Sequence, residues 1–306
     1  MSRYYHPPFV NEGDSIAIVS TARHIDRTKV EPAIRLFESW GLNVVLGEHI
    51  YNQDNQFAGE DQYRAQDLKD AIQDPEIKAI VCSRGGYGTV RVIDLVDDEL
   101  LLKNRKWIIG YSDITSLHMH MQAVAKCASI HATMPVNISD TPDEKEMQST
   151  ASLCRAMFGQ DLNYQLSDHR LNIHGEAQGE ILGGNLSMIY SMLGSKSCPD
   201  WYNAILFIED LDEYLYHIDR MMMNLKRNKI LDKVAGIVVG GMSDMNDNTI
   251  PFGLGAEEII HSHTKNLGIP VYFGFEAGHL SPNLALVMGS RCSIKGGRLN
   301  FSLENS

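Results

Sequence analysis

The sequence predicts an α/β protein of two domains. The N-terminal domain is expected to have a mainly parallel sheet flanked by helices, flavodoxin-like or Rossmann-like, and the C-terminal domain to be a second, β-rich α/β unit. Strand-like and helix-like patterns alternate through the first half, and 306 residues are enough for two cores. The periodic pattern also weakens near the middle. We therefore expect a first domain at 1–155, a linker at 156–175 and a second domain at 176–306.

Four short apolar runs in the first half predict buried strands: "SIAIVST" (15–21), "NVVLG" (43–47), "IKAIVC" (77–82) and "WIIGYS" (107–112). A segment with helical spacing follows each of them, at 28–41, 61–74, 89–97 and 114–126. Such β-α-β-α alternation predicts parallel strands. Ligands of these sheets bind beyond the carboxyl ends of the strands, where "SRGGYG" (83–88) and "GYSD" (110–113) would lie.

The second half repeats the alternation less regularly. Strands are predicted at "AILFIED" (204–210), "VAGIVVGGM" (234–242) and "PVYFGF" (270–275), with a helix at 214–230 and a β-like tail at 293–304. The polar stretch between about 151 and 180 carries no long periodic run. This contrast supports the expected linker.

Composition restricts the class of partner. A net charge of -12 and a pI near 5.4 argue against nucleic-acid binding through a general basic field, although a local basic pocket could still hold a small anion. The N-terminus lacks the pattern of a secretory signal, and no segment predicts a membrane span. Five cysteines without CxxC spacing favour a reducing cytoplasm.

The corner at Ser112 allows two interpretations. The strand "WII" stops at Gly110, and a helix follows within a few residues. Ser112 or Asp113 could cap that helix, because both side chains accept hydrogen bonds from the free amides of a first turn. Alternatively, the corner holds Ser112 out of the sheet as a nucleophile.

The glycine-rich loop "CSRGGYGT" (82–89) could act in three ways. Its amides could cradle an anion, its glycines could simply permit a tight turn, or one amide could face Ser112 as an oxyanion donor. The loop is neither GxGxxG nor a phosphate-binding P-loop with its lysine, so the nucleotide signal is weak.

A base and an orienting carboxylate for Ser112 would have to come from other loops at strand ends. Glu209 is the first polar residue after an apolar strand, and His279 lies in a glycine-flanked loop after another. The chain order Ser, Glu, His matches that of α/β hydrolases, although G-Y-S-D is not their G-x-S-x-G motif.

The sequence predicts no metal site. His118 and His120, like His261 and His263, lie two residues apart on predicted helices, so the two side chains of each pair point in different directions. We therefore expect neither a metal nor another cofactor.

Five motifs together resemble those of the LD-carboxypeptidase family. They occur in this order: "SRGGYG" (83–88), "GYSDIT" (110–115), "GGNL" (183–186), "IEDLDEYLYHIDRM" (208–221) and "GHLSPNLALVMG" (278–289). The resemblance spans nearly the whole chain. "HATMP" (131–135) departs from it, since family members commonly have a glycine-containing HGPM-like stretch there, and this affects the expected shape of the local pocket.

The resemblance implies a serine peptidase with a Ser-Glu-His triad divided between the two domains. It implies Ser112 as nucleophile, Glu209 as triad carboxylate and His279 as base, with the amides of Gly86 and Asp113 as oxyanion hole. Asn185 of "GGNL" would contact substrate.

The activity implied is that of a cytoplasmic carboxypeptidase of peptidoglycan recycling. It would release the terminal D-alanine of a murein tetrapeptide by cleaving an L-to-D bond, without cofactor, nucleic acid or membrane, as a homodimer. Two alternatives stay open. One is a peptidase like the microcin C immunity proteins, acting on an aminoacyl-nucleotide or related amide, although the compact length favours the murein substrate. The other is a non-catalytic module that holds an anion at "SRGGYG".

Overall fold

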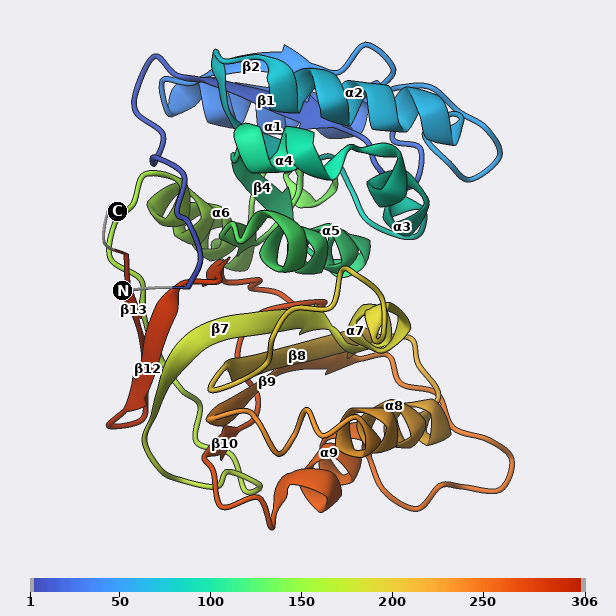
Figure 1. Ribbon diagram of the computed structural model, residues 1–306, viewed down its shortest axis with the longest axis vertical. Helices are drawn as coiled ribbons and strands as arrows, with labels where there is room; N and C mark the ends of the chain where they lie inside the picture. The colour runs from blue at the N-terminus through green and yellow to red at the C-terminus, as the bar shows by residue number, and fades with distance from the viewer. Residues whose placement is uncertain (1–2, 304–306) are drawn as a thin grey trace.

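The computed structural model describes residues 3–303 and arranges them around two sheets, one in the upper and one in the lower half of Figure 1. The first sheet has, among these residues, six strands in the order β11-β5-β4-β3-β1-β2. They are β1 (Ser15–Val19), β2 (Asn43–Leu46), β3 (Ile77–Cys82), β4 (Trp107–Gly110), β5 (Ser129–His131) and β11 (Leu286–Met288). Strands β1 to β5 are parallel, and their order 2-1-3-4-5 is the flavodoxin-like one. The predicted fold class is confirmed.

Helices cover both faces of this sheet because its strands are apolar on both faces. Along β1, Ile16 and Ile18 pack in the same cluster as Phe37, while Ala17 and Val19 face the opposite way. The helices on the first of these faces are α1 (Arg27–Ser39) and α6 (Glu144–Met157), and those on the second include α2 (Asp61–Gln73) and α5 (Thr115–His120). The shorter helices α3 (Thr89–Val92) and α4 (Asp98–Lys103) lie between β3 and β4 in the chain.

The second sheet combines parallel and antiparallel strands. Within the described chain it has seven, in the order β10-β9-β8-β7-β12-β13-β6. They are β6 (Asn163–Gln165), β7 (Ala177–Asn185), β8 (Ile205–Leu211), β9 (Gly236–Ser243), β10 (Val271–Tyr272), β12 (Arg291–Lys295) and β13 (Arg298–Ser302). Strands β7 to β10 are parallel, and the helices beside them are α7 (Leu186–Met192), α8 (Leu215–Arg227) and α9 (Ala256–Thr264). This half is the predicted β-rich α/β unit.

The two halves exchange structure. Strand β11, from the C-terminal part of the chain, pairs antiparallel with β5 in the first sheet. Strand β6, inside the expected linker 156–175, pairs with β13 in the second. Each of the two large hydrophobic clusters contains side chains from both sheets. The boundaries at 155 and 176 stay a prediction, and the helices of residues 3–303 include none with the length and apolarity of a membrane span.

Candidate active site

Ser112 occupies a strained corner. Strand β4 ends at Gly110, and Ser112 opens a short 3₁₀ helix, η2 (Ser112–Ile114), that leads into α5. Its φ of 64° lies in the left-handed region, which costs a non-glycine residue about 1–3 kcal/mol. Neither η2 nor α5 receives a side-chain cap, and the Asp113 carboxylate instead accepts a hydrogen bond from the Thr89 amide at the start of α3, at 2.8 Å. Neither Ser112 nor Asp113 therefore caps the helix that follows β4.

An unbroken chain of hydrogen bonds joins the three residues that the sequence singled out. The Ser112 Oγ lies 3.0 Å from His279 Nε2, and His279 Nδ1 lies 2.6 Å from Glu209 Oε2. Because an ionised carboxylate can only accept, Nδ1 carries the proton and Nε2 presents its lone pair to the serine hydroxyl. The backbone amide of His279 also donates to Glu209 Oε2, at 3.1 Å.

Glu209 is held by its strand and by a close-packed glycine. It is fully buried near the carboxyl end of β8, where the pairing with β9 shifts register between Ile208 and Asp210. The extra residue is on β9, where Gly240 and Gly241 span the interval opposite Glu209. A Cβ on Gly278 would lie 2.6 Å from Glu209 atoms, and Gly278 has φ +101°, so only glycine fits there without strain.

The loop that carries His279 is anchored to two elements. The Gly241 amide on β9 donates to Ala277 O at 3.0 Å, and the Gly278 amide donates to Asn283 Oδ1 at 2.8 Å. The Asn283 amide in turn donates to Ser149 Oγ on α6, at 2.8 Å. Helix α6, from the first half of the chain, thus helps to fix the loop of His279, the predicted base.

Electrostatics prepare the histidine to take a proton. Burial lowers the pKa of His279, but its hydrogen bond to Glu209 and the charges of Glu209 and Asp210 more than compensate, so the pKa lies above 6.5. Asp210 is also buried, and desolvation together with the neighbouring Glu209 charge raises its pKa to about 7. The Tyr111 ring packs on the His279 imidazole with centroids 5.0 Å apart.

Two backbone amides next to Ser112 are free to bind an oxyanion. A Cβ on Gly85 would lie 3.0 Å from Ser112 Cβ and 3.4 Å from the Asp113 nitrogen, so the glycine loop after β3 lies against the serine corner. Within the described chain, the amides of Gly86 and Asp113 donate no hydrogen bond. The oxyanion role of both amides stays a prediction.

A cavity of about 510 Å³ opens over the serine. Its lining includes all six predicted site residues except Glu209, which lies behind His279. Asn185 contributes to the wall, but its side chain is already engaged: Oδ1 accepts the Met188 amide and the Ser187 hydroxyl, and Nδ2 donates to Asp210. Asn185 therefore caps α7, and its contact with substrate stays a prediction.

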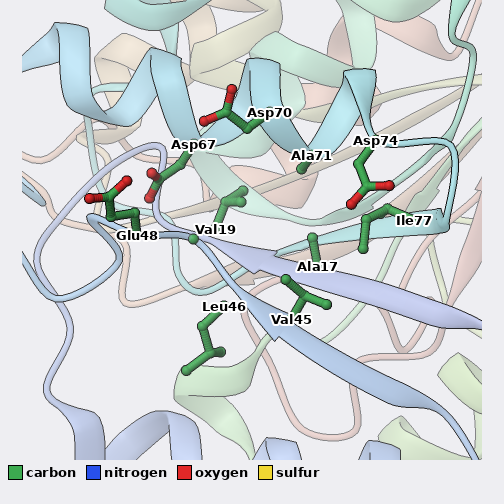
Figure 2. A pocket seen from close by; sticks show the side chains of 11 residues that line it. Ala17, Val19, Val45, Leu46, Glu48, Asp67, Asp70, Ala71, Asp74 and Ile77 are labelled. Atoms are coloured by element: carbon green, nitrogen blue, oxygen red, sulfur yellow. The ribbon is translucent and has the colours of Figure 1, made fainter.

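A smaller cavity lies elsewhere. Figure 2 shows it between α2 and the strands β1 and β2, with a volume of about 120 Å³. Carboxylates of Glu48, Asp67, Asp70 and Asp74 surround an apolar floor, and none of its lining residues is a serine, cysteine or histidine. Residues 3–303 contain no group of three or more His, Cys, Asp or Glu side chains placed to hold a metal ion. Ser112 lines the cavity of about 510 Å³ and not this one.

Sequence reasoning missed several residues that shape the site. Thr115 Oγ1 accepts the Asn185 amide at 3.0 Å and so joins the helix after Ser112 to the end of β7. A Cβ on Gly184 would meet Thr115, which explains one glycine of "GGNL". In the divergent segment 131–135, His131 is buried against Tyr111, and Met134 lines the cavity. The sequence offered one signal for two of these residues: Asp210 and Thr115 are polar and lie close in sequence to Glu209 and Ser112.

Both halves of the chain match models of a known family. Residues 16–132 match the model of the LD-carboxypeptidase N-terminal domain, and residues 178–294 match that of the LD-carboxypeptidase C-terminal domain. The "probable murein peptide carboxypeptidase" of Bacillus subtilis (strain 168) is 33% identical over 292 residues, covering 95% of this chain and 91% of the relative.

Two solved structures show the same fold. The muramoyltetrapeptide carboxypeptidase from Oxalobacter formigenes is 26% identical with a TM-score of 0.83, over 94% of this chain and 97% of that one. MccF in complex with glutamyl sulfamoyl guanosine is 21% identical with a TM-score of 0.86, over 99% of each chain, and this likeness concerns the fold alone. Because MccF is covered over nearly all its solved length, chain length does not separate the two kinds of relative.

Proposed function

Because this chain belongs to the LD-carboxypeptidase family, a family of peptidases, we propose that it is a serine carboxypeptidase acting on murein tetrapeptide. It would hydrolyse the bond between an L-centre and the terminal D-alanine, in peptidoglycan recycling. The hydrogen-bonded chain from Ser112 through His279 to Glu209 carries the proposal. By family resemblance we extend it to a cytoplasmic homodimer that needs no cofactor.

The geometry supports a double-displacement reaction. Ser112 Oγ attacks the carbonyl carbon as its proton passes to His279 Nε2, and the amides of Gly86 and Asp113 stabilise the oxyanion. When the tetrahedral intermediate collapses, the C–N bond breaks, and His279 returns the proton to the leaving amino group of D-alanine. A water molecule, deprotonated by His279, then hydrolyses the ester and restores Ser112. The net reaction consumes one water and yields tripeptide and D-alanine.

Glu209 acts throughout on His279. Its carboxylate holds the tautomer in which Nε2 faces the serine, and its charge stabilises the imidazolium that forms in each half-reaction. One oxyanion donor is typically worth about 3–4 kcal/mol of transition-state stabilisation, and general-base catalysis a further ~10²–10⁴-fold in rate.

Incubation with purified murein tetrapeptide tests the proposal. We expect stoichiometric release of D-alanine and labelling of Ser112 by a fluorophosphonate probe. Ser112→Ala should abolish both, whereas Ser39→Ala, which alters an exposed hydroxyl on α1, should change neither. Absence of labelling in the folded wild-type protein would instead favour the non-catalytic anion-binding module. Labelling with hydrolysis of an aminoacyl sulfamoyl nucleoside, but not of tetrapeptide, would favour the microcin-type substrate.

A further inference from the structure

The charges that line the Ser112 cavity are segregated. Arg23 and Arg84 lie on the side of the glycine loop, after β1 and β3. Three of the four lining carboxyl groups, those of Asp210, Asp212 and Glu213, come from the end of β8 and the loop after it, whereas Asp113 follows β4 and lies near Arg23. Among the lining residues the two guanidinium groups are the only permanent cations. Within this lining, Arg23 and Arg84 are therefore the permanent positive partners available to a substrate carboxylate.

The arginine wall touches the proposed oxyanion hole. A Cβ on Gly86 would lie 2.5 Å from Arg23 Cδ, so the arginine side chain lies directly on this glycine. Gly86 in turn belongs to the loop packed against Ser112. The Arg23 side chain would therefore lie next to the amide proposed to hold the scissile carbonyl oxygen.

Both guanidinium groups lack an ion pair within the described chain. Arg23 makes no side-chain hydrogen bond with residues 3–303, and Arg84 only donates from Nη1 to the carbonyl of His24, at 3.0 Å. Arg84 Nε is buried without a protein partner. Burial lowers the pKa of Arg84, and the nearby Arg23 charge lowers it further, with a partial counter-effect from Asp26. Two adjacent like charges without a paired carboxylate are unfavourable unless an anion joins them.

The nearest buried carboxyl does not fill this role. Burial raises the pKa of Asp113, and the charges of Arg64 and Arg23 lower it by less, so its pKa is raised overall. Its Oδ2 accepts the Thr89 amide, so that oxygen is directed to α3. The arginine pair thus keeps its capacity for an external anion.

We propose that Arg23 and Arg84 bind the free terminal carboxylate of the residue that is released. The inference rests on the proposed function and specifies how the same site selects a chain end. Three covalent bonds separate a scissile carbonyl carbon from the carboxylate carbon of the following residue, so the two lie about 3–4 Å apart. If the oxyanion binds the Gly86 amide, the carboxylate would lie near Arg23 and Arg84. A planar guanidinium group can donate two parallel hydrogen bonds to a carboxylate.

This assignment explains exopeptidase selectivity in physical terms. A peptide that continued past the scissile bond would place a neutral amide against two guanidinium groups and gain no ion pair. The acidic residues Asp212 and Glu213, which follow β8, would repel a carboxylate placed near them and so disfavour the reversed orientation of the peptide.

The test compares murein tetrapeptide with the same peptide carrying a C-terminal amide. We expect wild-type kcat/KM to favour the free acid, and Arg23→Gln and Arg84→Gln each to lower kcat/KM for the acid by ~10–10²-fold while leaving the amide nearly unchanged. Arg84→Lys should recover part of the loss. Arg298→Gln, on an exposed edge of β13, is the matched control and should behave as wild type. Thermal unfolding establishes that each variant is folded.

The outcomes separate this inference from the proposed function. If wild-type protein releases D-alanine but the arginine variants lose equally on acid and amide, or lose nothing, the anchor is wrong and the carboxypeptidase stands. Binding of both peptides to Ser112→Ala, measured by calorimetry, gives a readout independent of turnover: the acid should bind more tightly, and Arg23→Gln in that background should remove the difference. If a glutamyl sulfamoyl nucleoside binds in preference to tetrapeptide and loses affinity in the arginine variants, the pair serves a different anion and the carboxylate assignment fails.

Discussion

At the residue scale, the site depends on close approaches that ordinary side chains could not make. Ser112 adopts a left-handed φ, and Gly278 leaves room for Glu209 against the backbone of the His279 loop. Both features place reactive atoms at hydrogen-bonding distance before substrate arrives. Local backbone strain is common at active sites, where it helps to hold reactive groups in position.

Glu209→Gln should lower the kcat/KM plateau by ~10²–10⁴-fold while leaving the protein folded, because an amide cannot stabilise the imidazolium. The pH profile should change as well. Because neutral His279 is the proposed base, wild-type kcat/KM should rise with pH through a pKa above 6.5. Loss of Glu209 removes the main contribution that raises this pKa while burial still lowers it, so the acid limb should move to lower pH.

The control for this profile is Asp210→Asn. Asp210 titrates in the same range, with a pKa of about 7, and together with Glu209, Tyr111 and His131 it is one of the titratable groups around His279. An acid limb that survives in Asp210→Asn belongs to His279. A limb that vanishes there, with Glu209→Gln unshifted, would contradict the assignment.

Gly278→Ala should reduce kcat by about 10²-fold, because the added methyl group would displace Glu209 or the His279 loop by a fraction of an ångström or more. Gly268→Ala is the matched control: Gly268 also has a positive φ, +72°, but a Cβ there meets nothing within 4 Å. Kinetics and thermal unfolding of both variants separate clash from backbone strain. Equal loss of kcat in the two variants would mean that the clash is irrelevant.

At the element scale, the ends of strands and helices hold the site together. The bulge in β9 lies opposite Glu209 of β8, β9 and α6 fix the His279 loop, and the cap of α7 joins β7 to β8 through Asn185 and Asp210. Each connection crosses between elements that are distant in sequence. Local sequence therefore specifies each element but not the contacts between them.

Asn185→Ala should lower the free energy of unfolding by about 1–2 kcal/mol, since it removes the cap of α7 and leaves buried Asp210 without its Nδ2 donor. Asp143→Ala, which removes the corresponding cap of α6 away from the cavity lining, is the control and should cost about 1 kcal/mol. Urea denaturation and KM are measured for both. A raised KM at unchanged stability in Asn185→Ala would show direct substrate contact instead.

At the scale of the whole molecule, the two sheets form one interdependent structure. The C-terminal strand β11 completes the first sheet, and both hydrophobic clusters contain side chains from both sheets. The proposed nucleophile comes from one half, and the proposed base and carboxylate come from the other. The site thus requires the complete fold.

We expect a single cooperative unfolding transition. In urea, far-UV circular dichroism should coincide with tryptophan fluorescence of a Trp201→Phe variant, which reports on the first half through Trp40 and Trp107. Val287→Ala on β11 should lower the free energy of unfolding by about 2 kcal/mol and shift both probes together. Two separated transitions, with only one shifted by Val287→Ala, would mean that the halves unfold independently.

The sequence by itself determined the fold class, the parallel strands and the identity of the family. Apolar runs such as 77–82 and 107–110 predict buried parallel strands, because such strands are apolar on both faces. It also marked Ser112, Glu209 and His279, since each is polar at the end of an apolar strand or in a glycine-flanked loop. Short elements escaped it: β5 and β11 have three residues each, too few to show a period.

Only the tertiary structure decided how these residues meet. In the folded chain Ser112 Oγ forms a hydrogen bond with His279 and does not cap the following helix. The Asn185 side chain caps α7. The tertiary structure also brought Arg23 and Arg84, after neighbouring strands, to one wall of the cavity. The physical reason is that strand pairing and core packing act between segments distant in sequence, and so bring together Ser112 and His279, which are 167 positions apart. Their joint geometry is a property of the folded chain and is encoded in no local pattern.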